Sequence, residues 1–201
     1  MKVQDLYETP MMIGDNDFDP VIDGFDLTDT VENTQAYEKI IDSKDSNLIQ
    51  KHSDIGSKYL YQYGSKIVLL DTVAKTVDYY VKVETGKFRI TGQYVTQVEV
   101  WRTTDSPVYD VVRTVFFDYI LKSHDTVLSD SLQTNDGRRL WVNLVGYAFQ
   151  EGKYVYVVDL NTGTLHGIKN SNDYRSRIQD FYSTQKKSAY VRIMISNKKV
   201  D

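Results

Sequence analysis

The chain of 201 residues contains no cysteine and only three histidines. Without cysteine the protein has no disulfide bonds and no thiolate metal ligands. The histidines, His52, His124 and His166, are too scattered along the sequence to predict a histidine-rich metal centre. We therefore expect neither a disulfide-stabilised fold nor a zinc site.

The sequence also lacks any run of about eighteen apolar residues, the length that a membrane-spanning helix needs. Its N-terminus does not show the basic-then-apolar order of a secretory signal. These absences predict a soluble, cytoplasmic protein that does not enter a membrane. The length suits one domain with its own core and leaves room for an appended segment.

Positive charge is missing from one end of the chain. Residues 3–38 hold ten Asp or Glu and no Lys, Arg or His, whereas residues 39–201 hold 23 Lys or Arg against 18 acidic residues. This asymmetry predicts an acidic extended arm over residues 1–33, followed by a globular domain over residues 34–201. Such an arm either docks on its own body or binds a basic protein partner. The body has no basic run beyond two Lys–Lys pairs, so its charge does not favour a nucleic-acid binder.

Part of the acidic arm resembles a calcium-binding loop in its spacing. Acidic residues occupy the first, third, fifth, ninth and twelfth places of that pattern, as Asp15, Asp17, Asp19, Asp23 and Asp26. Pro20 stands where the sharp turn needs glycine, and the last Asp is shorter than the usual Glu. We therefore expect a solvated acidic arm and no metal site.

The central stretch, Thr103–Trp141, predicts a helix, a short strand and the start of a second helix. Ser106 and Pro107 suit the start of the first helix, and turn residues 122–125 end it. Residues 126–129 predict an interior strand, and Thr134 or Asn135 can cap the second helix. Apolar residues at helical spacing predict one buried face on each helix: Val108, Val111, Val112, Val115, Phe116 and Tyr119 on the first, and Trp141, Leu144, Val145, Ala148 and Phe149 on the second.

Periodic patterns divide the rest of the chain into further elements. Residues 34–51 predict a helix. Alternating residues predict an antiparallel meander with strands at 66–71, 76–84 and 88–102 and hairpin turns at 71–75 and 85–87. After Gly152, which ends the second helix, the pattern predicts a doubly buried strand at 154–159, a turn at 161–163, a helix capped by Asn170 or Ser171, and a last strand at 189–196.

This order of elements resembles the GNAT acetyltransferase superfamily. The segment SDSLQTNDGRRLWVNL, Ser129–Leu144, resembles in particular divergent GNAT-like proteins encoded by bacteriophages. The resemblance implies an α+β fold with a mixed, mostly antiparallel central sheet and flanking helices, here with an N-terminal acidic extension. It also implies that residues 88–102 are the family's fourth strand, 106–122 its pyrophosphate helix, 126–130 its fifth strand and 137–150 the next helix.

Members of this family bind acetyl-coenzyme A at the loop before the pyrophosphate helix, where glycines bring backbone amides close to the anion. By the resemblance, the matching residues are Arg102, Thr103, Thr104, Ser106, Val108 and Tyr109. This loop has no glycine, Pro107 removes one amide donor, and Asp105 and Asp110 add negative charge. We therefore expect no cofactor, and acetyl-coenzyme A only if the chain is an active transferase.

The resemblance also implies a general acid, usually a tyrosine, on the helix after the fifth strand. Trp141 is the aromatic residue at that point, and because an indole has no proton to give at neutral pH, we expect it to pack in the core. Asp130, Ser129 and Ser131 lie where the fourth and fifth strands would splay apart, and they are the candidate catalytic residues of an active transferase. His124 is expected in a solvent-exposed turn.

Two functions follow from these patterns. The poor cofactor loop favours a degenerate GNAT scaffold, encoded by a phage, that binds a protein partner through its acidic arm or its tyrosine-rich sheet. Its role would be host interaction, anti-defence or virion-associated, in the host cytoplasm or the virion. The alternative is an active acyl-coenzyme A-dependent N-acyltransferase that acts on an amine or a nucleobase.

Overall fold

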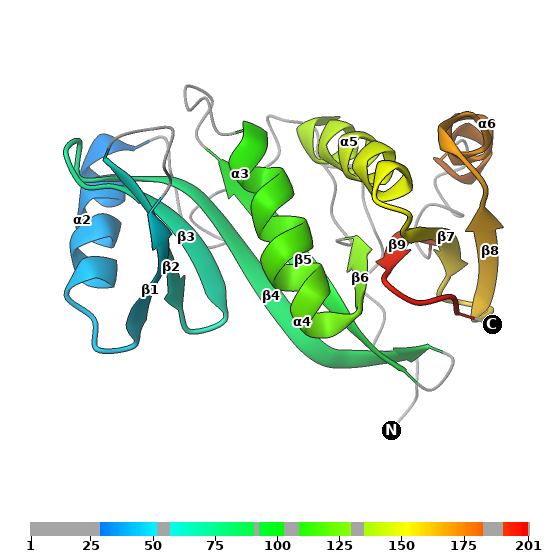
Figure 1. The fold of residues 1–201 in the computed structure, drawn as a ribbon, viewed down its shortest axis with the longest axis horizontal. Helices are drawn as coiled ribbons and strands as arrows, with labels where there is room; N and C mark the ends of the chain where they lie inside the picture. The colour runs from blue at the N-terminus through cyan, green and yellow to red at the C-terminus, as the bar shows by residue number, and fades with distance from the viewer. Residues whose placement is uncertain are drawn as a thin grey trace. The chain divides into compact units, whose positions relative to one another are not determined.

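The computed structural model describes residues 29–51, 57–90, 93–102, 109–129, 135–182 and 191–200 (Figure 1). Within these residues the fold is a mixed α+β arrangement, and none of their helices is long and apolar enough to cross a membrane. The chain divides into two compact units. The amino-terminal unit comprises Phe18–Glu84 and Glu99–Val115, and the carboxy-terminal unit comprises Met1–Asp17, Thr85–Val98 and Phe116–Asp201.

Four antiparallel strands form the sheet of the amino-terminal unit. In spatial order they are β1 (Ser46–Lys51), β2 (Lys58–Tyr63), β3 (Lys66–Asp71) and the first part of β4 (Thr76–Ile90). The tight turns between them include Gly64 and Lys75, both at positive φ. The predicted strands at 66–71 and 76–84 are confirmed. β2 was not among the predicted strands, although its sequence KYLYQY alternates buried and half-buried residues at its start.

One helix packs on this sheet, and its bounds differ from the prediction. α2 (Thr30–Ile41) begins four residues earlier than expected, because the Asp29 carboxylate accepts hydrogen bonds from the backbone N–H groups of Val31 and Glu32 at 2.8 and 2.9 Å. The helical prediction for the end of residues 34–51 is wrong, since β1 occupies Ser46–Lys51 and pairs with β2. Residues 46–51 form a strand because they pair with β2, although the spacing of their apolar residues also suited a helix.

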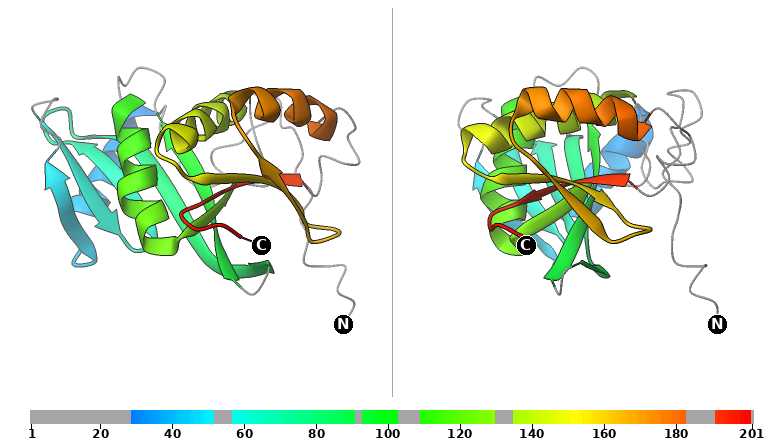
Figure 2. Two further views of the ribbon diagram at one scale, coloured as in Figure 1. Left: turned by 45° about the vertical axis from the view of Figure 1, so that its right-hand side comes forward. Right: turned by 90° about the vertical axis from the view of Figure 1, so that its right-hand side faces the viewer.

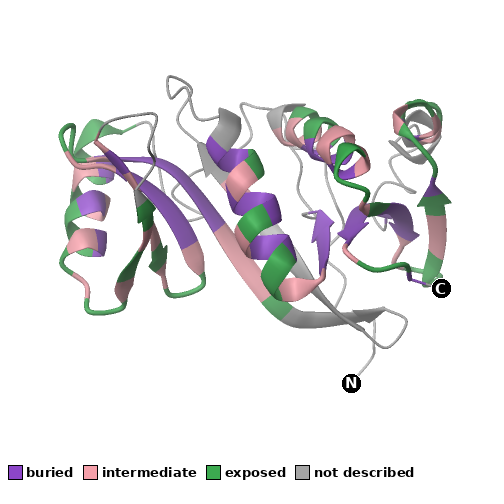
Figure 3. Ribbon diagram, in the orientation of Figure 1, coloured by how far each residue is buried: buried purple, intermediate pink, exposed green. Residues whose placement is uncertain are grey.

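The core of this unit lies between α2 and the sheet. Tyr37 and Ile40 of α2 pack against Val68, Leu70, Val77 and Tyr80 of β3 and β4. Figure 3 shows the buried residues of α2 confined to one face of the helix. The apolar side of α2 therefore packs on the sheet.

The predicted hairpin turn at residues 85–87 is wrong. β4 continues through Gly86 to Ile90, and β5 (Gln93–Arg102) begins three residues later. A single glycine weakens a strand without ending it when strand-forming residues follow, here Phe88 and Ile90.

The predicted buried helix is present as a continuous segment, Tyr109–His124. It consists of α3 (Tyr109–Thr114), a π-helical segment η2 (Val115–Leu121) and α4 (Lys122–His124). The π-helix bonds residue i to i+5 and so adds a residue to each turn. This wider turn keeps more consecutive side chains on one side of the helix, which suits its buried set: Val115, Phe116, Phe117, Ile120 and Leu121.

Five strands form the sheet of the carboxy-terminal unit, in the order β5, β6 (Thr126–Ser129), β9 (Val191–Ser196), β7 (Tyr154–Asp159) and β8 (Thr164–Ile168). β5 pairs with β6 in parallel through Thr96–Val98, and the pairings of β6 with β9, β9 with β7 and β7 with β8 are antiparallel. The predicted strands at 126–129 and 154–159 are confirmed, whereas β8 was not predicted. The predicted last strand is confirmed over residues 191–196, and residues 189–190 lie outside the described part of the chain.

Two helices cover one face of β9, β7 and β8. They are α5 (Asn135–Gln150) and α6 (Ser171–Tyr182), and both lie on the same side of these strands in Figures 1 and 2. Gly152, at φ 66°, ends α5 as predicted, with the Lys153 N–H donating to the Ala148 carbonyl at 2.8 Å. The apolar face predicted for α5 is confirmed by the burial of Trp141, Leu144, Val145 and Ala148. Phe149 is half-buried.

Candidate functional site

Most of the residues expected to bind a cofactor lie outside the described part of the chain. This holds for Thr103, Thr104, Ser106 and Val108, and also for Asp130, Ser131 and the acidic residues 15–26. Arg102 is described as the last residue of β5 and Tyr109 as the first residue of α3. The predicted pyrophosphate loop and calcium-like loop therefore stay predictions.

Ser129 is the candidate catalytic residue that the structure describes, and it is a core residue. Its side chain is fully buried, and its hydroxyl oxygen accepts a hydrogen bond from the backbone N–H of Ile193 at 3.1 Å. This bond ties the end of β6 to β9. The hydroxyl therefore supports strand pairing and does not face solvent.

Trp141 occupies the core, as predicted. It is 3 % exposed, and its ring packs edge-on against Phe116, with 5.7 Å between the ring centroids. His124 differs from the expectation of a solvent-exposed turn, because it is a half-buried helical residue at the end of α4. Burial lowers the pKa of its imidazole below the ordinary value, which favours the neutral ring.

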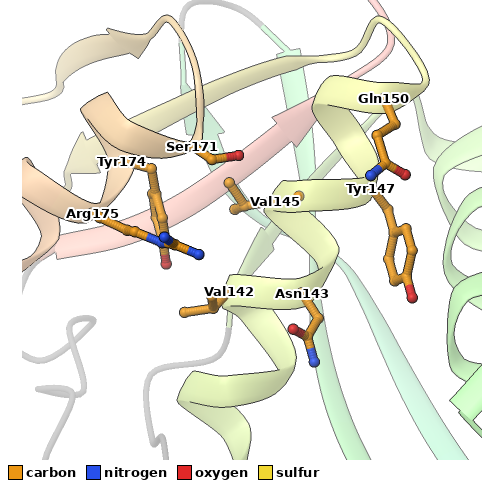
Figure 4. A pocket seen from close by; sticks show the side chains of 9 residues that line it. Val142, Asn143, Val145, Tyr147, Gln150, Ser171, Tyr174 and Arg175 are labelled. Carbon is orange, nitrogen blue, oxygen red and sulfur yellow. The ribbon is translucent and has the colours of Figure 1, made fainter.

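A groove between α5 and α6 is a concave site that the described residues form on the carboxy-terminal unit (Figure 4). It has a volume of about 220 Å³. Pockets for drug-sized ligands measure roughly 300–1,000 Å³, so this groove suits an amino-acid side chain better than a whole cofactor. Its lining residues are Val142, Asn143, Val145, Gly146, Tyr147 and Gln150 from α5, with Ser171, Tyr174 and Arg175 from α6.

Gly146 keeps the floor of this groove open. It lies in the interior of α5, where glycine is less favourable than alanine by about 0.5–1 kcal/mol. A Cβ atom added at this position would meet no atom within 4 Å apart from its own helix and its chain neighbours. Neither close packing nor the φ angle therefore requires glycine here, and its effect is to leave space between Val142 and Gln150 along one ridge of α5.

The first turn of α6 holds its own acidic residue, Asp173, in bonds to residues other than Arg175. Asn170 caps the helix, since its Oδ1 accepts from the N–H groups of Asn172 and Asp173 at 3.0 and 2.9 Å. The Lys169 N–H and the Arg177 side chain hydrogen-bond the Asp173 carboxylate and lower its pKa, so that this acid is already paired. In Figure 4 the side chains of Tyr174 and Arg175 extend from α6 toward Val142.

The charge that the described residues bring to the groove is positive. Arg175 is the only charged residue among the described lining residues, and it is exposed. It makes no hydrogen bond or ion pair among the residues that the structure describes. Sequence patterns predicted the helix but not this role, because only the packing of α6 beside α5 shows that Arg175 lines the same groove as Gly146.

A second charged cluster lies in the amino-terminal unit. The Lys58 ammonium group donates to the Asp78 carboxylate and lies 3.8 Å from Oδ2 of Asp71, and all three side chains are at most 15 % exposed. A bulge in β4 between Val77 and Tyr79 places Asp78 beside Lys58. Asp71 is further held by the Ser57 hydroxyl and by the Val73 and Ala74 N–H groups. The cluster therefore links β2, β3 and β4 through the side chains of Lys58, Asp71 and Asp78.

The described residues contain no group of three His, Asp or Glu side chains arranged to hold a metal ion. No protein-family model and no curated protein matches this chain.

Proposed function

We propose that the protein is a GNAT-like scaffold that acts by binding another protein rather than by transferring an acyl group. The observation that carries this proposal is the burial of Ser129, a candidate catalytic residue, and of Trp141, the aromatic residue at the point where the resemblance places a general acid. Ser129 is fully buried and bonded to Ile193, and Trp141 packs on Phe116. A buried hydroxyl in a strand-pairing bond is a poor nucleophile or proton donor for a substrate in solvent.

The order of elements supports the GNAT-like part of the proposal. A long strand, β5, is followed by the helical segment Tyr109–His124 and by β6, which pairs with β5 in parallel. The helix α5 and the strand β7 then follow in the expected sequence. This order of strand, helix, strand and helix is the order that the resemblance implies for residues 88–150.

The size of the groove supports a binding role. At about 220 Å³ it is too small for acetyl-coenzyme A as a whole, but it can hold one side chain of a partner. Its described lining combines the apolar side chains of Val142 and Val145 with several polar side chains. Protein-binding sites of this kind hold an anchor residue of the partner in a pocket.

Calorimetric titration of the full chain with acetyl-coenzyme A tests the proposal. We expect no binding at micromolar concentrations, with an acetyltransferase known to bind the cofactor as the positive control. Micromolar binding that is lost when residues 103–109 are replaced would support the alternative, an acyl-coenzyme A-dependent N-acyltransferase. Asp130, Ser129 and Ser131 would then be the first residues to substitute.

A further inference from the structure

We propose that the groove between α5 and α6 binds an acidic peptide segment of a partner protein, with a carboxylate beside an apolar side chain. This inference rests on the proposed binding function and adds the surface and the chemistry of the ligand. The partner's carboxylate pairs with Arg175, and its apolar side chain enters the space above Gly146.

Charge complementarity selects an acidic ligand. Arg175 brings one positive charge to the groove, and no carboxylate is found among the described residues that line it. The acidic residue in the first turn of α6, Asp173, is paired with Arg177 at 2.6 Å and accepts a hydrogen bond from the Lys169 N–H. An incoming carboxylate therefore meets an arginine that has no ion pair to give up among the described residues, and arginine can bind it through two parallel hydrogen bonds.

The apolar residues of the lining favour a ligand that carries an apolar side chain next to its carboxylate. Val142 is 39 % exposed, so it presents apolar surface in the groove on the side of α5 away from its core-facing residues. Gly146, one turn later on α5, provides the space beside it, and Val145 forms the buried floor. The lining also includes Asn143, Gln150 and Ser171, whose side-chain amides and hydroxyl are groups that can bond a peptide backbone.

Selection of a random peptide library displayed on a carrier, against the immobilised full chain, tests this inference. We expect enriched peptides that carry Asp or Glu next to Leu, Met or Phe. The best synthetic peptide should then bind the wild-type protein in fluorescence anisotropy and lose affinity at least tenfold in Arg175→Glu and in Gly146→Gln. Binding should also weaken as salt concentration rises, because the contact is partly ionic.

Two matched variants control for charge and for helix stability. Lys44→Glu makes the same kind of charge reversal at an exposed residue of the amino-terminal unit, and it should leave affinity unchanged. Gly146→Ala adds only a methyl group to open space, and it should reduce affinity less than threefold. Circular dichroism and thermal melting establish that each variant is folded.

Several results would overturn the inference. These are enrichment of basic peptides, the absence of any enriched sequence, or equal affinity for wild type, Arg175→Glu and Gly146→Gln. A stronger affinity after Asp15, Asp17, Asp19 and Asp23 are changed to Asn in the full chain would identify the chain's own acidic segment, rather than a partner, as the occupant. None of these results depends on the titration with acetyl-coenzyme A, so the groove and the proposed function can fail separately.

Discussion

The side-chain amide of Asn33 bonds both backbone groups of Val77. Its Nδ2 donates to the Val77 carbonyl oxygen at 3.0 Å, and its Oδ1 accepts from the Val77 N–H at 2.6 Å. Asn33 is 4 % exposed, so these bonds are formed away from solvent and attach α2 to β4. Asn33 therefore attaches α2 to β4, and α2 includes residues 30–33, which the charge pattern placed in the acidic arm.

Replacing Asn33 with Ala should destabilise the protein by about 1–3 kcal/mol, because the variant leaves buried backbone groups without their partner. Urea unfolding followed by circular dichroism measures this change in the free energy of unfolding. Asn47→Ala, an exposed asparagine on β1, is the matched control and should change stability by less than about 0.5 kcal/mol. Equal stability of the two variants would contradict the role of Asn33.

Phe116→Ala should destabilise the protein by about 3–5 kcal/mol, since it removes a buried ring that packs on both Phe117 and Trp141. Asp118→Ala, on the exposed side of the same π-helical segment, should be close to neutral. Guanidinium unfolding curves for both variants check the helix phase. A neutral Phe116→Ala would show that the buried face is assigned wrongly.

Lys58→Met should cost about 3–5 kcal/mol, because it removes the ammonium group beside the buried carboxylate of Asp78 and the half-buried carboxylate of Asp71. The double variant Lys58→Met, Asp78→Asn should recover part of this loss, because it also removes the negative charge that Lys58 contacts most closely. Chemical unfolding of the single and double variants measures the recovery. A double variant less stable than Lys58→Met would argue against an electrostatic role for Lys58.

The pH dependence of stability should include a contribution from Asp71. Burial alone would raise the pKa of this carboxyl, but hydrogen bonds from the Ala74 N–H, the Ser57 hydroxyl and the Val73 N–H, together with the Lys58 charge, lower it below its ordinary value. A carboxyl with a lowered folded-state pKa stabilises the fold above its unfolded pKa of about 3.9, and this contribution is lost as pH falls through the folded-state pKa.

We therefore expect Asp71→Asn to melt at a lower temperature than wild type at pH 7, with the difference shrinking below about pH 4. Ser57→Ala keeps the carboxyl and removes one of its hydrogen bonds, so it should show the same trend with a smaller amplitude. Thermal melts between pH 7 and pH 2.5 measure both effects. A difference that grows on acidification would have the wrong sign for this assignment.

Two glycines near the end of α5 should respond in opposite ways to alanine. Gly146→Ala should stabilise the protein by about 0.5–1 kcal/mol, because it improves an α-helical position without a steric conflict. Gly152→Ala should destabilise it by about 1–2 kcal/mol, because Gly152 has φ 66°. Differential scanning calorimetry distinguishes them, and a destabilising Gly146→Ala would mean that the groove floor is closed.

Local patterns by themselves determined much of the carboxy-terminal unit. The cap at Asn170, the end of α5 at Gly152 and the buried stripe of α5 were all predictable, because each depends on residues within one or two helical turns. The doubly buried strand at 154–159 was equally clear from its continuous apolar run.

Only the tertiary structure decided how other residues are used. Residues 46–51 form a strand because β2 offers a partner, although their spacing also suits a helix. Ser129 became a core residue through its bond to Ile193, 64 positions away, and the β4 bulge brought Asp78 to Lys58. The groove at Gly146 and Arg175 likewise exists only where α5 meets α6. Strand pairing, burial and concavity depend on contacts between distant residues, and local periodicity carries no information about which of those contacts form.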